Sequence, residues 1–112
     1  MKGMTAALVI ALLASLQACS DDVDPRFRVR NDRGSKVNMQ IKTSGGNTIN
    51  INDVEAAVLT DYHYAAPGTI EATAVIQNES VSPAIGFVAF ADESYTIVVV
   101  NSTPPTLSIE SP

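Results

Sequence analysis

The strongest strand signal in the chain is Tyr95-Thr96-Ile97-Val98-Val99-Val100, near its C-terminal end. Ile97 to Val100 are four consecutive β-branched residues, which favour an extended strand. The run is apolar on both faces, so both faces of the strand should be covered. It is therefore predicted to be a central strand, with residues 97 and 99 facing one side and residues 98 and 100 facing the other.

The chain between Pro25 and this stretch reads as a series of shorter strands. Apolar residues alternate with charged or polar ones, which is the pattern of half-buried strands, and no convincing helical period appears. Strands at this spacing predict one all-β domain, an immunoglobulin-like or transthyretin-like antiparallel β-sandwich of seven to eight strands over residues 26–112. The expected strands are 27–30, 37–42, 48–52, 58–64, 70–76, 84–90, 95–100 and 106–110.

Two turns are predicted at glycines, which can adopt the left-handed backbone conformation that such turns require. A three-residue loop over 44–46 pairs Ile41 with Ile49, whereas a two-residue loop would place Ile41 opposite a polar residue; burial of one face favours the longer loop. Gly46 suits the left-handed position at its end. Ala66-Pro67-Gly68-Thr69 has the composition of a type II turn, with Pro second and Gly third.

The N-terminal segment predicts an export signal. Lys2 precedes a stretch without charge, residues 4–16, which suits a signal peptide and is short for a membrane-spanning helix. The stretch ends in Leu16-Gln17-Ala18-Cys19, which resembles the lipobox of bacterial lipoproteins. That resemblance implies cleavage between Ala18 and Cys19 and lipidation of Cys19. A plain secretory signal and an uncleaved anchor are the alternatives.

These features divide the chain into a signal peptide at 1–18, a lipidated cysteine with an acidic tether at 19–25, and the domain at 26–112. Ser20 after the cysteine resembles the outer-membrane class of lipoproteins, and a following acidic run resembles a surface-export signal in some bacteria. We therefore expect a lipid-anchored envelope protein at the outer membrane, with the periplasmic or surface side left open.

The mature domain resembles an uncharacterised family of bacterial envelope β-sandwich domains. The resemblance is carried by Phe27-Arg28-Val29-Arg30-Asn31, by Tyr62 to Gly68, and by Tyr95 to Val100. The resemblance implies a β-sandwich fold and a location in the cell envelope, and it implies no defined activity. The chain departs from the family pattern at 92–94, where Asp-Glu-Ser replaces the usual glycine turn.

Charge and residue types exclude several function classes. The chain carries a net charge of −5, which becomes −6 without Lys2, and this is a poor composition for binding nucleic acid. Arg26, Arg28 and Arg30 are expected on the solvent face of a strand, with a phosphate- or headgroup-binding stripe as the alternative. The single histidine and single cysteine predict no metal site and no cofactor.

Tyr62, His63 and Tyr64 are the remaining candidate site, a possible ligand-binding surface. The competing interpretation places both tyrosines in the core or across a strand pair, with His63 facing solvent. No nucleophile motif accompanies them, so we expect no enzyme. The expected function is a non-enzymatic structural or accessory envelope module; the alternative is a surface binding module for a glycan, a peptide or another envelope protein.

Overall fold

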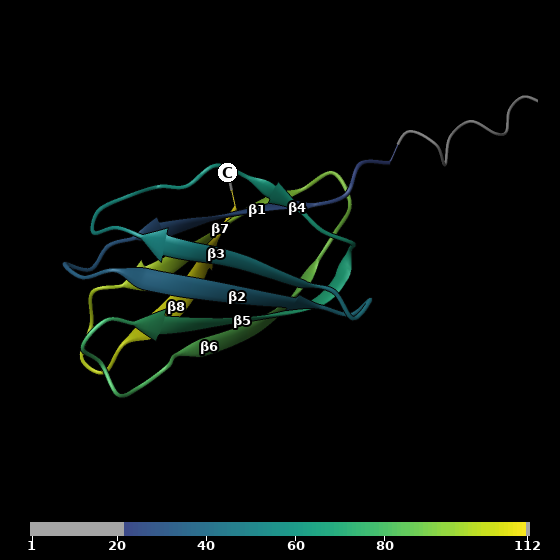
Figure 1. The fold of residues 1–112 in the computed structure, drawn as a ribbon. Helices are drawn as coiled ribbons and strands as arrows, with labels where there is room; N and C mark the ends of the chain where they lie inside the picture. Colours follow the sequence, from purple (N-terminus) through teal and green to yellow (C-terminus); the bar gives the residue numbers. More distant parts are fainter. Residues whose placement is uncertain (1–21, 112) are drawn as a thin grey trace, which may run out of the picture.

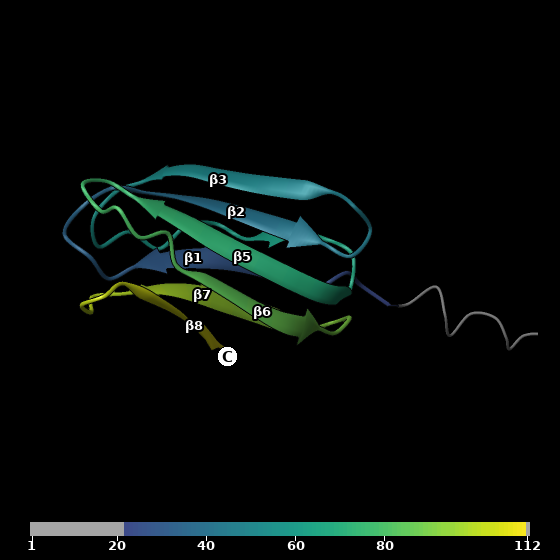
Figure 2. The same ribbon diagram turned by 90° about the horizontal axis from the view of Figure 1, so that it is seen from below.

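The computed structural model describes residues 22–111 as two β-sheets packed face to face (Figures 1 and 2). Sheet A has the strand order β4-β1-β7-β8, and sheet B has the order β3-β2-β5-β6. The predicted all-β sandwich is therefore confirmed for this part of the chain. The strands are β1 (Arg26–Asn31), β2 (Val37–Thr43), β3 (Thr48–Val54), β4 (His63–Tyr64), β5 (Gly68–Ile76), β6 (Ala84–Ala89), β7 (Ser94–Val100) and β8 (Thr106–Glu110).

The stretch at 95–100 forms β7, which lies between β1 and β8 as predicted for a central strand. Ile97 and Val99 are fully buried and belong to the core between the sheets. Val98 faces the outer side of sheet A, yet its exposed fraction is only 2%. Arg30 of β1 hydrogen-bonds Glu110 of β8, so its side chain crosses over β7 and covers this face.

The first strand has a pairing that local sequence patterns do not reveal. β1 runs parallel to β7, from Arg26 opposite Ser94 to Asn31 opposite Val99, while the other strand pairs are antiparallel. In an immunoglobulin sandwich the first strand pairs with the second. Here β1 pairs with β4 and β7, so the domain departs from the immunoglobulin strand order.

The β2–β3 hairpin has the predicted register. Ile41 lies opposite Ile49 and Met39 lies opposite Ile51, so the apolar side chains of both strands share one face. The loop occupies residues 44–46 because Thr43 N donates to the carbonyl of Asn47. Gly46 has a φ of 89°, the left-handed conformation that this loop type requires.

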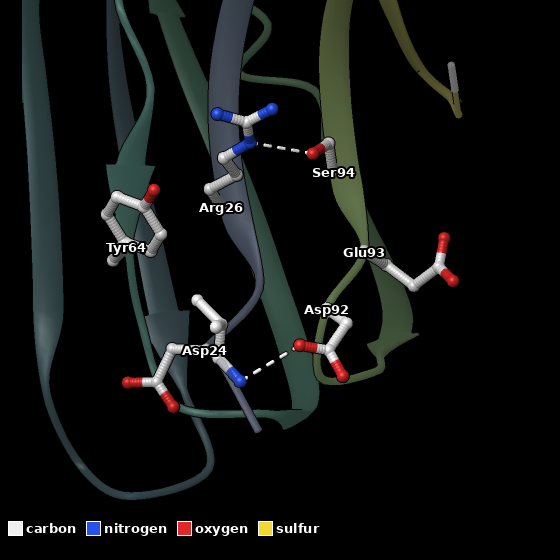
Figure 3. A pocket seen from close by; sticks show the side chains of 7 residues that line it. Asp24, Arg26, Tyr64, Asp92, Glu93 and Ser94 are labelled. Carbon is white, nitrogen blue, oxygen red and sulfur yellow. Dashed lines mark hydrogen bonds between the residues drawn. The ribbon is translucent and has the colours of Figure 1, made fainter. Parts of the chain in front are cut away.

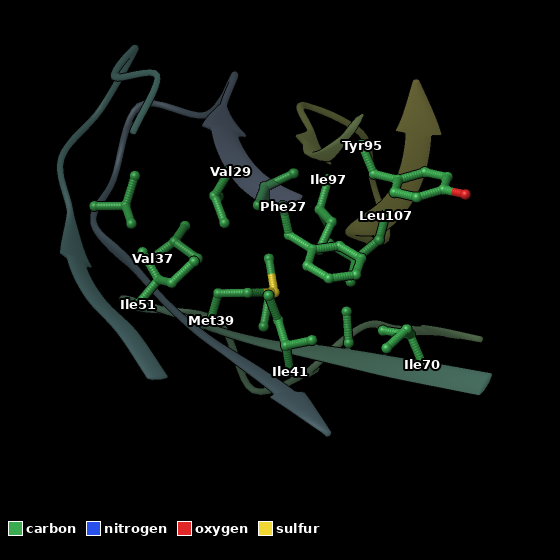
Figure 4. Packing of buried hydrophobic residues seen from close by; sticks show 14 of the residues in the cluster. Phe27, Val29, Val37, Met39, Ile41, Ile51, Ile70, Tyr95, Ile97 and Leu107 are labelled. Atoms are coloured by element: carbon green, nitrogen blue, oxygen red, sulfur yellow. The ribbon is translucent and has the colours of Figure 1, made fainter. Parts of the chain in front are cut away.

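The core is a single apolar layer between the two sheets (Figure 4). Phe27 of β1 stacks on Tyr95 of β7 with ring centroids 5.6 Å apart. Phe87 of β6, in the other sheet, packs against both rings. The Tyr95 hydroxyl accepts a hydrogen bond from the backbone N–H of Phe90, so its one polar group is satisfied at the edge of the core. Elsewhere the layer is filled by aliphatic side chains from both sheets.

The predicted strand at 58–64 is wrong over most of its length. Only His63–Tyr64 forms a strand, and Leu59 makes one isolated bridge to Arg30. Between them, Thr60 binds Val29 twice, since its N–H donates to the Val29 carbonyl and its hydroxyl accepts from the Val29 N–H. A side-chain oxygen thus replaces a backbone carbonyl in the ladder, and the chain leaves regular geometry.

The turn predicted at 66–69 is instead a crossing between sheets. It leads from β4 in sheet A to β5 in sheet B, and Gly68 already pairs with Ala89. Gly68 keeps a positive φ of 122°. A Cβ at this position would lie 2.6 Å from the Ser44 hydroxyl oxygen, so glycine is needed for close approach as well as for backbone conformation.

The last residues of the predicted tether are attached to the folded body. Val23 N donates to Asp92 Oδ1 at 2.9 Å, and Asp92 N donates to the Val23 carbonyl at 2.7 Å. Pro25 is fully buried, and its carbonyl accepts from Ala65 N. The chain therefore joins the sandwich at a fixed point, next to the turn between β6 and β7. We call this end of the sandwich the tether end.

Candidate functional site

The predicted lipidation and cleavage residues, Ala18 and Cys19, lie outside the described residues. Within residues 22–111 no helix is long and apolar enough to cross a membrane. No group of three metal-ligating side chains occurs within the same range. The candidate sites within residues 22–111 lie on the surface of the sandwich.

The predicted Tyr62-His63-Tyr64 surface is split between two sides of sheet A. His63 lies opposite Phe27, which is fully buried, so the histidine projects toward the core side and is half-buried. Tyr64 lies opposite Arg26 and is 58% exposed. The expected solvent-facing histidine is therefore wrong, and Tyr64 lies across a strand pair from Arg26, the second of the two expected positions, rather than in the core. The structure does not join the three rings into one surface.

Tyr62 instead meets two arginines of β1. The guanidinium carbon of Arg26 lies 4.1 Å from the centre of the Tyr62 ring, and that of Arg28 lies 4.7 Å from it. Arg26 Nε donates to the Ser94 hydroxyl at 2.7 Å, and Arg28 Nε donates to the Thr96 hydroxyl at 2.9 Å. We refer to Arg26, Arg28 and Tyr62 as the arginine–tyrosine cluster. It brings together one predicted site residue and two residues of the predicted arginine face.

Arg30, the third arginine of the same face, is engaged differently. It forms ion pairs with Asp32 at 3.0 Å and with Glu110 at 2.9 Å, using Nε and both terminal nitrogens. Hydrogen bonds to Asp32, and to a lesser extent to Glu110, raise the pKa of Arg30 above its ordinary value. The Nε and both terminal nitrogens of Arg30 thus donate to carboxylates of the protein. Within residues 22–111, the side chains of Arg26 and Arg28 donate hydrogen bonds through Nε alone.

A shallow cavity of about 230 Å³ lies at the tether end, beside the cluster (Figure 3). Arg26 stands at one end of it, and Asp24 and Asp92 lie at the other, with the guanidinium directed away from both carboxylates. Tyr64 and Ser94 line it between these ends. The carboxylates give this cavity a mixed charge, while the side of Arg26 that faces Tyr62 stays cationic.

A second hollow, of about 180 Å³, lies on the outer face of sheet B. Gln40 of β2 lies between Asn50 of β3 and Thr73 of β5, so amides and a hydroxyl form one row across the sheet. These groups both donate and accept hydrogen bonds without carrying charge. The arrangement suits a neutral polar ligand. The lining residues are Asn38, Met39, Gln40, Asn50, Asn52, Thr73 and Val75.

Two polar residues that the sequence analysis did not single out hold the opposite end of the sandwich. Asn31 is fully buried; its amide nitrogen donates to the carbonyls of Ser35, Val54 and Glu55, and its oxygen accepts from Arg33 N. Arg33 donates to the carbonyls of Val100 and Ser102 and to Glu79. The signal for Asn31 was available, because it occupies an inward position after Phe27 and Val29.

Comparison with known proteins adds no family to this description. No family model matches the sequence, and no curated protein is significantly similar to it. The predicted resemblance to envelope β-sandwich domains therefore stays a prediction, and function has to be argued from the chain's own residues.

Proposed function

We propose that the chain is the precursor of a lipid-anchored lipoprotein of the bacterial envelope, whose sandwich is a non-enzymatic structural or accessory module. The observation that carries the proposal is the N-terminal sequence, in which an uncharged stretch at 4–16 leads directly to Ala18-Cys19. Cleavage before Cys19 and acylation of its thiol and amino groups would give the two or three lipid chains that stable anchoring needs.

The attachment of Val23 to Asp92 supports a module held close to the membrane. Three residues lie between Cys19 and Val23, and the four Cα–Cα steps of an extended chain cover at most about 14 Å. An anchor at Cys19 would therefore keep the tether end of the sandwich next to the headgroups. A module that assists a larger envelope assembly gains from such a fixed orientation.

The use of the polar side chains supports a non-enzymatic role. Asn31 and Arg33 hold loops together, and Arg30 is fixed by two carboxylates. His63 projects toward Phe27 and the core side of sheet A.

The anchor is tested by Cys19→Ala in the producing bacterium. The variant should lose metabolic labelling by fatty acid and move from the membrane fraction to the soluble fraction, because the acylated thiol is removed. Ser20→Ala is the matched control and should keep both the label and the membrane fraction. A Cys19→Ala protein that stays wholly with membranes would contradict the proposal.

The second candidate function is a binding module for a neutral glycan, favoured by the amide row on sheet B. Gln40, Asn50 and Thr73 present donors and acceptors that match sugar hydroxyls. Co-sedimentation with purified envelope polysaccharide tests it. Asn50→Ala should reduce binding, while Asn47→Ala in the neighbouring loop should not. Equal loss, or no binding by the wild type, excludes this candidate.

A further inference from the structure

The arginine–tyrosine cluster contains two positive charges that form no ion pair with residues 22–111. The chain has twelve acidic residues against seven Lys and Arg. Arg30, Arg33 and Lys36 each form an ion pair, but neither Arg26 nor Arg28 pairs with a carboxylate of residues 22–111. Two like charges on one face repel each other. Their placement is therefore unfavourable for the fold alone.

The protein nevertheless holds both guanidinium groups in fixed positions. One Tyr62 ring lies against both, and a hydroxyl of β7 binds the Nε of each. Within the described part of the chain, these side chains use no other donor, so the terminal N–H groups of both are left for a ligand. Side chains that are ordered before binding lose less entropy when a ligand arrives.

We propose that Arg26 and Arg28, supported by Tyr62, form a binding site for a phosphate group. A guanidinium presents two parallel N–H donors to an oxyanion, and two guanidiniums beside one ring present two such pairs. A carboxylate has two oxygens and one charge, and it fills one pair. A phosphate group carries up to two charges and three oxygens, and it can bind both pairs.

The surroundings decide where this phosphate group lies. Asp24 and Asp92 stand at the far end of the tether-end cavity, away from the Arg26 guanidinium (Figure 3). An anion in that cavity would meet their repulsion and that of Glu93, which also lines it. Between Arg26 and Arg28, the groups that bind the two guanidiniums are the Tyr62 ring and the hydroxyls of Ser94 and Thr96. Glu110, opposite Thr96 in β8, is bound to Arg30. The site goes beyond the proposed function, and it does not require the anchor.

The test is a titration of the purified full chain, in detergent, with inorganic phosphate at constant ionic strength balanced by chloride. The chain contains three Tyr and no Trp, so its ultraviolet emission comes from these tyrosines, of which Tyr62 lies against both arginines. We expect a saturable change in emission and a rise in melting temperature with phosphate, since a ligand that binds only the folded state stabilises it. An absence of saturable change would overturn the proposal.

Substitutions separate a defined site from general charge. Arg26→Gln and Arg28→Gln should each weaken phosphate binding by about tenfold or more, the effect of losing a charge-assisted hydrogen-bond pair. Arg28→Lys keeps the charge but loses the paired donors, and it should weaken binding by about fivefold or more. Lys42→Gln, which removes one charge from the outer face of sheet B, is the matched control and should stay within about twofold.

Three results would contradict the site: equal weakening by Lys42→Gln, unchanged affinity of Arg28→Lys, or binding of acetate as tight as that of phosphate. The source of the phosphate is distinguished by mixing the Cys19→Ala chain with vesicles that contain phosphatidic acid, whose phosphomonoester headgroup has three free oxygens and up to two charges. Vesicle association that inorganic phosphate displaces assigns the site to a lipid headgroup, and phosphate binding without association assigns it to a soluble phosphate. Because the Cys19→Ala chain should bind phosphate as wild type does, failure of the anchor and failure of the site give different results.

Discussion

Neighbouring residues of β7 should respond very differently to the same charge. Val99 is fully buried in the layer between the sheets, and Val99→Asp would place a carboxylate there without a partner. The loss of valine burial costs about 1.5–3 kcal/mol, and an unpaired buried charge costs several kcal/mol more. A domain of this size is stable by roughly 5–10 kcal/mol, so Val99→Asp should be largely unfolded.

Val98 offers the charge a partner. It lies opposite Arg30 in β1, whose guanidinium already crosses β7 to reach Glu110. A carboxylate from Val98→Asp would lie beneath that guanidinium, but Asp32 and Glu110 already bind it, so the attraction should offset only part of the burial cost. We expect a loss of about 2–3 kcal/mol, at the upper end of the ordinary range for single substitutions and smaller than the loss at position 99.

The assay is urea unfolding followed by tyrosine emission, with Val98→Asn and Val99→Asn as uncharged controls. Asn and Asp should have similar midpoints at position 98, whereas Asp should be much worse than Asn at position 99. Adding Arg30→Gln to Val98→Asp should increase its loss, and a double-mutant cycle measures that coupling. Equal midpoints for Val98→Asp and Val99→Asp would refute the assignment of the two faces of β7.

Three further substitutions test local features. Asn31→Ala removes the donor to three backbone carbonyls and should cost about 2–4 kcal/mol in urea unfolding; a loss below about 1 kcal/mol would contradict its structural role. Gly68→Ala should cost about 1–2 kcal/mol because φ is 122°, and adding Ser44→Ala should not restore the urea midpoint if the backbone is the cause. Ala57 has a φ of 64°, so Ala57→Gly should raise the melting temperature by a few degrees, and an unchanged or lower value would show that no strain is relieved.

The surfaces of the tether end are only partly predictable from sequence. Alternation along 26–30 correctly placed the arginines on the outer face, because side chains in a strand alternate with a period of two. The same pattern could not show that Tyr62 would reach Arg26 and Arg28, since Tyr62 lies outside regular strand geometry. That contact depends on Thr60, which binds β1 through its hydroxyl and redirects the chain.

Local features of the sandwich could be predicted from sequence: the β-branched run at 95–100 predicted a central strand, and apolar matching predicted the register of Ile41 with Ile49. Both follow from residues close together in the chain. The parallel pairing of β1 with β7 could not be predicted, because it joins segments almost 70 residues apart and no hairpin constrains it. The same pairing places Ser94 and Thr96 beside Arg26 and Arg28. The geometry of the arginine–tyrosine cluster is therefore a property of the assembled sheet, since its supporting hydroxyl groups come from a distant strand.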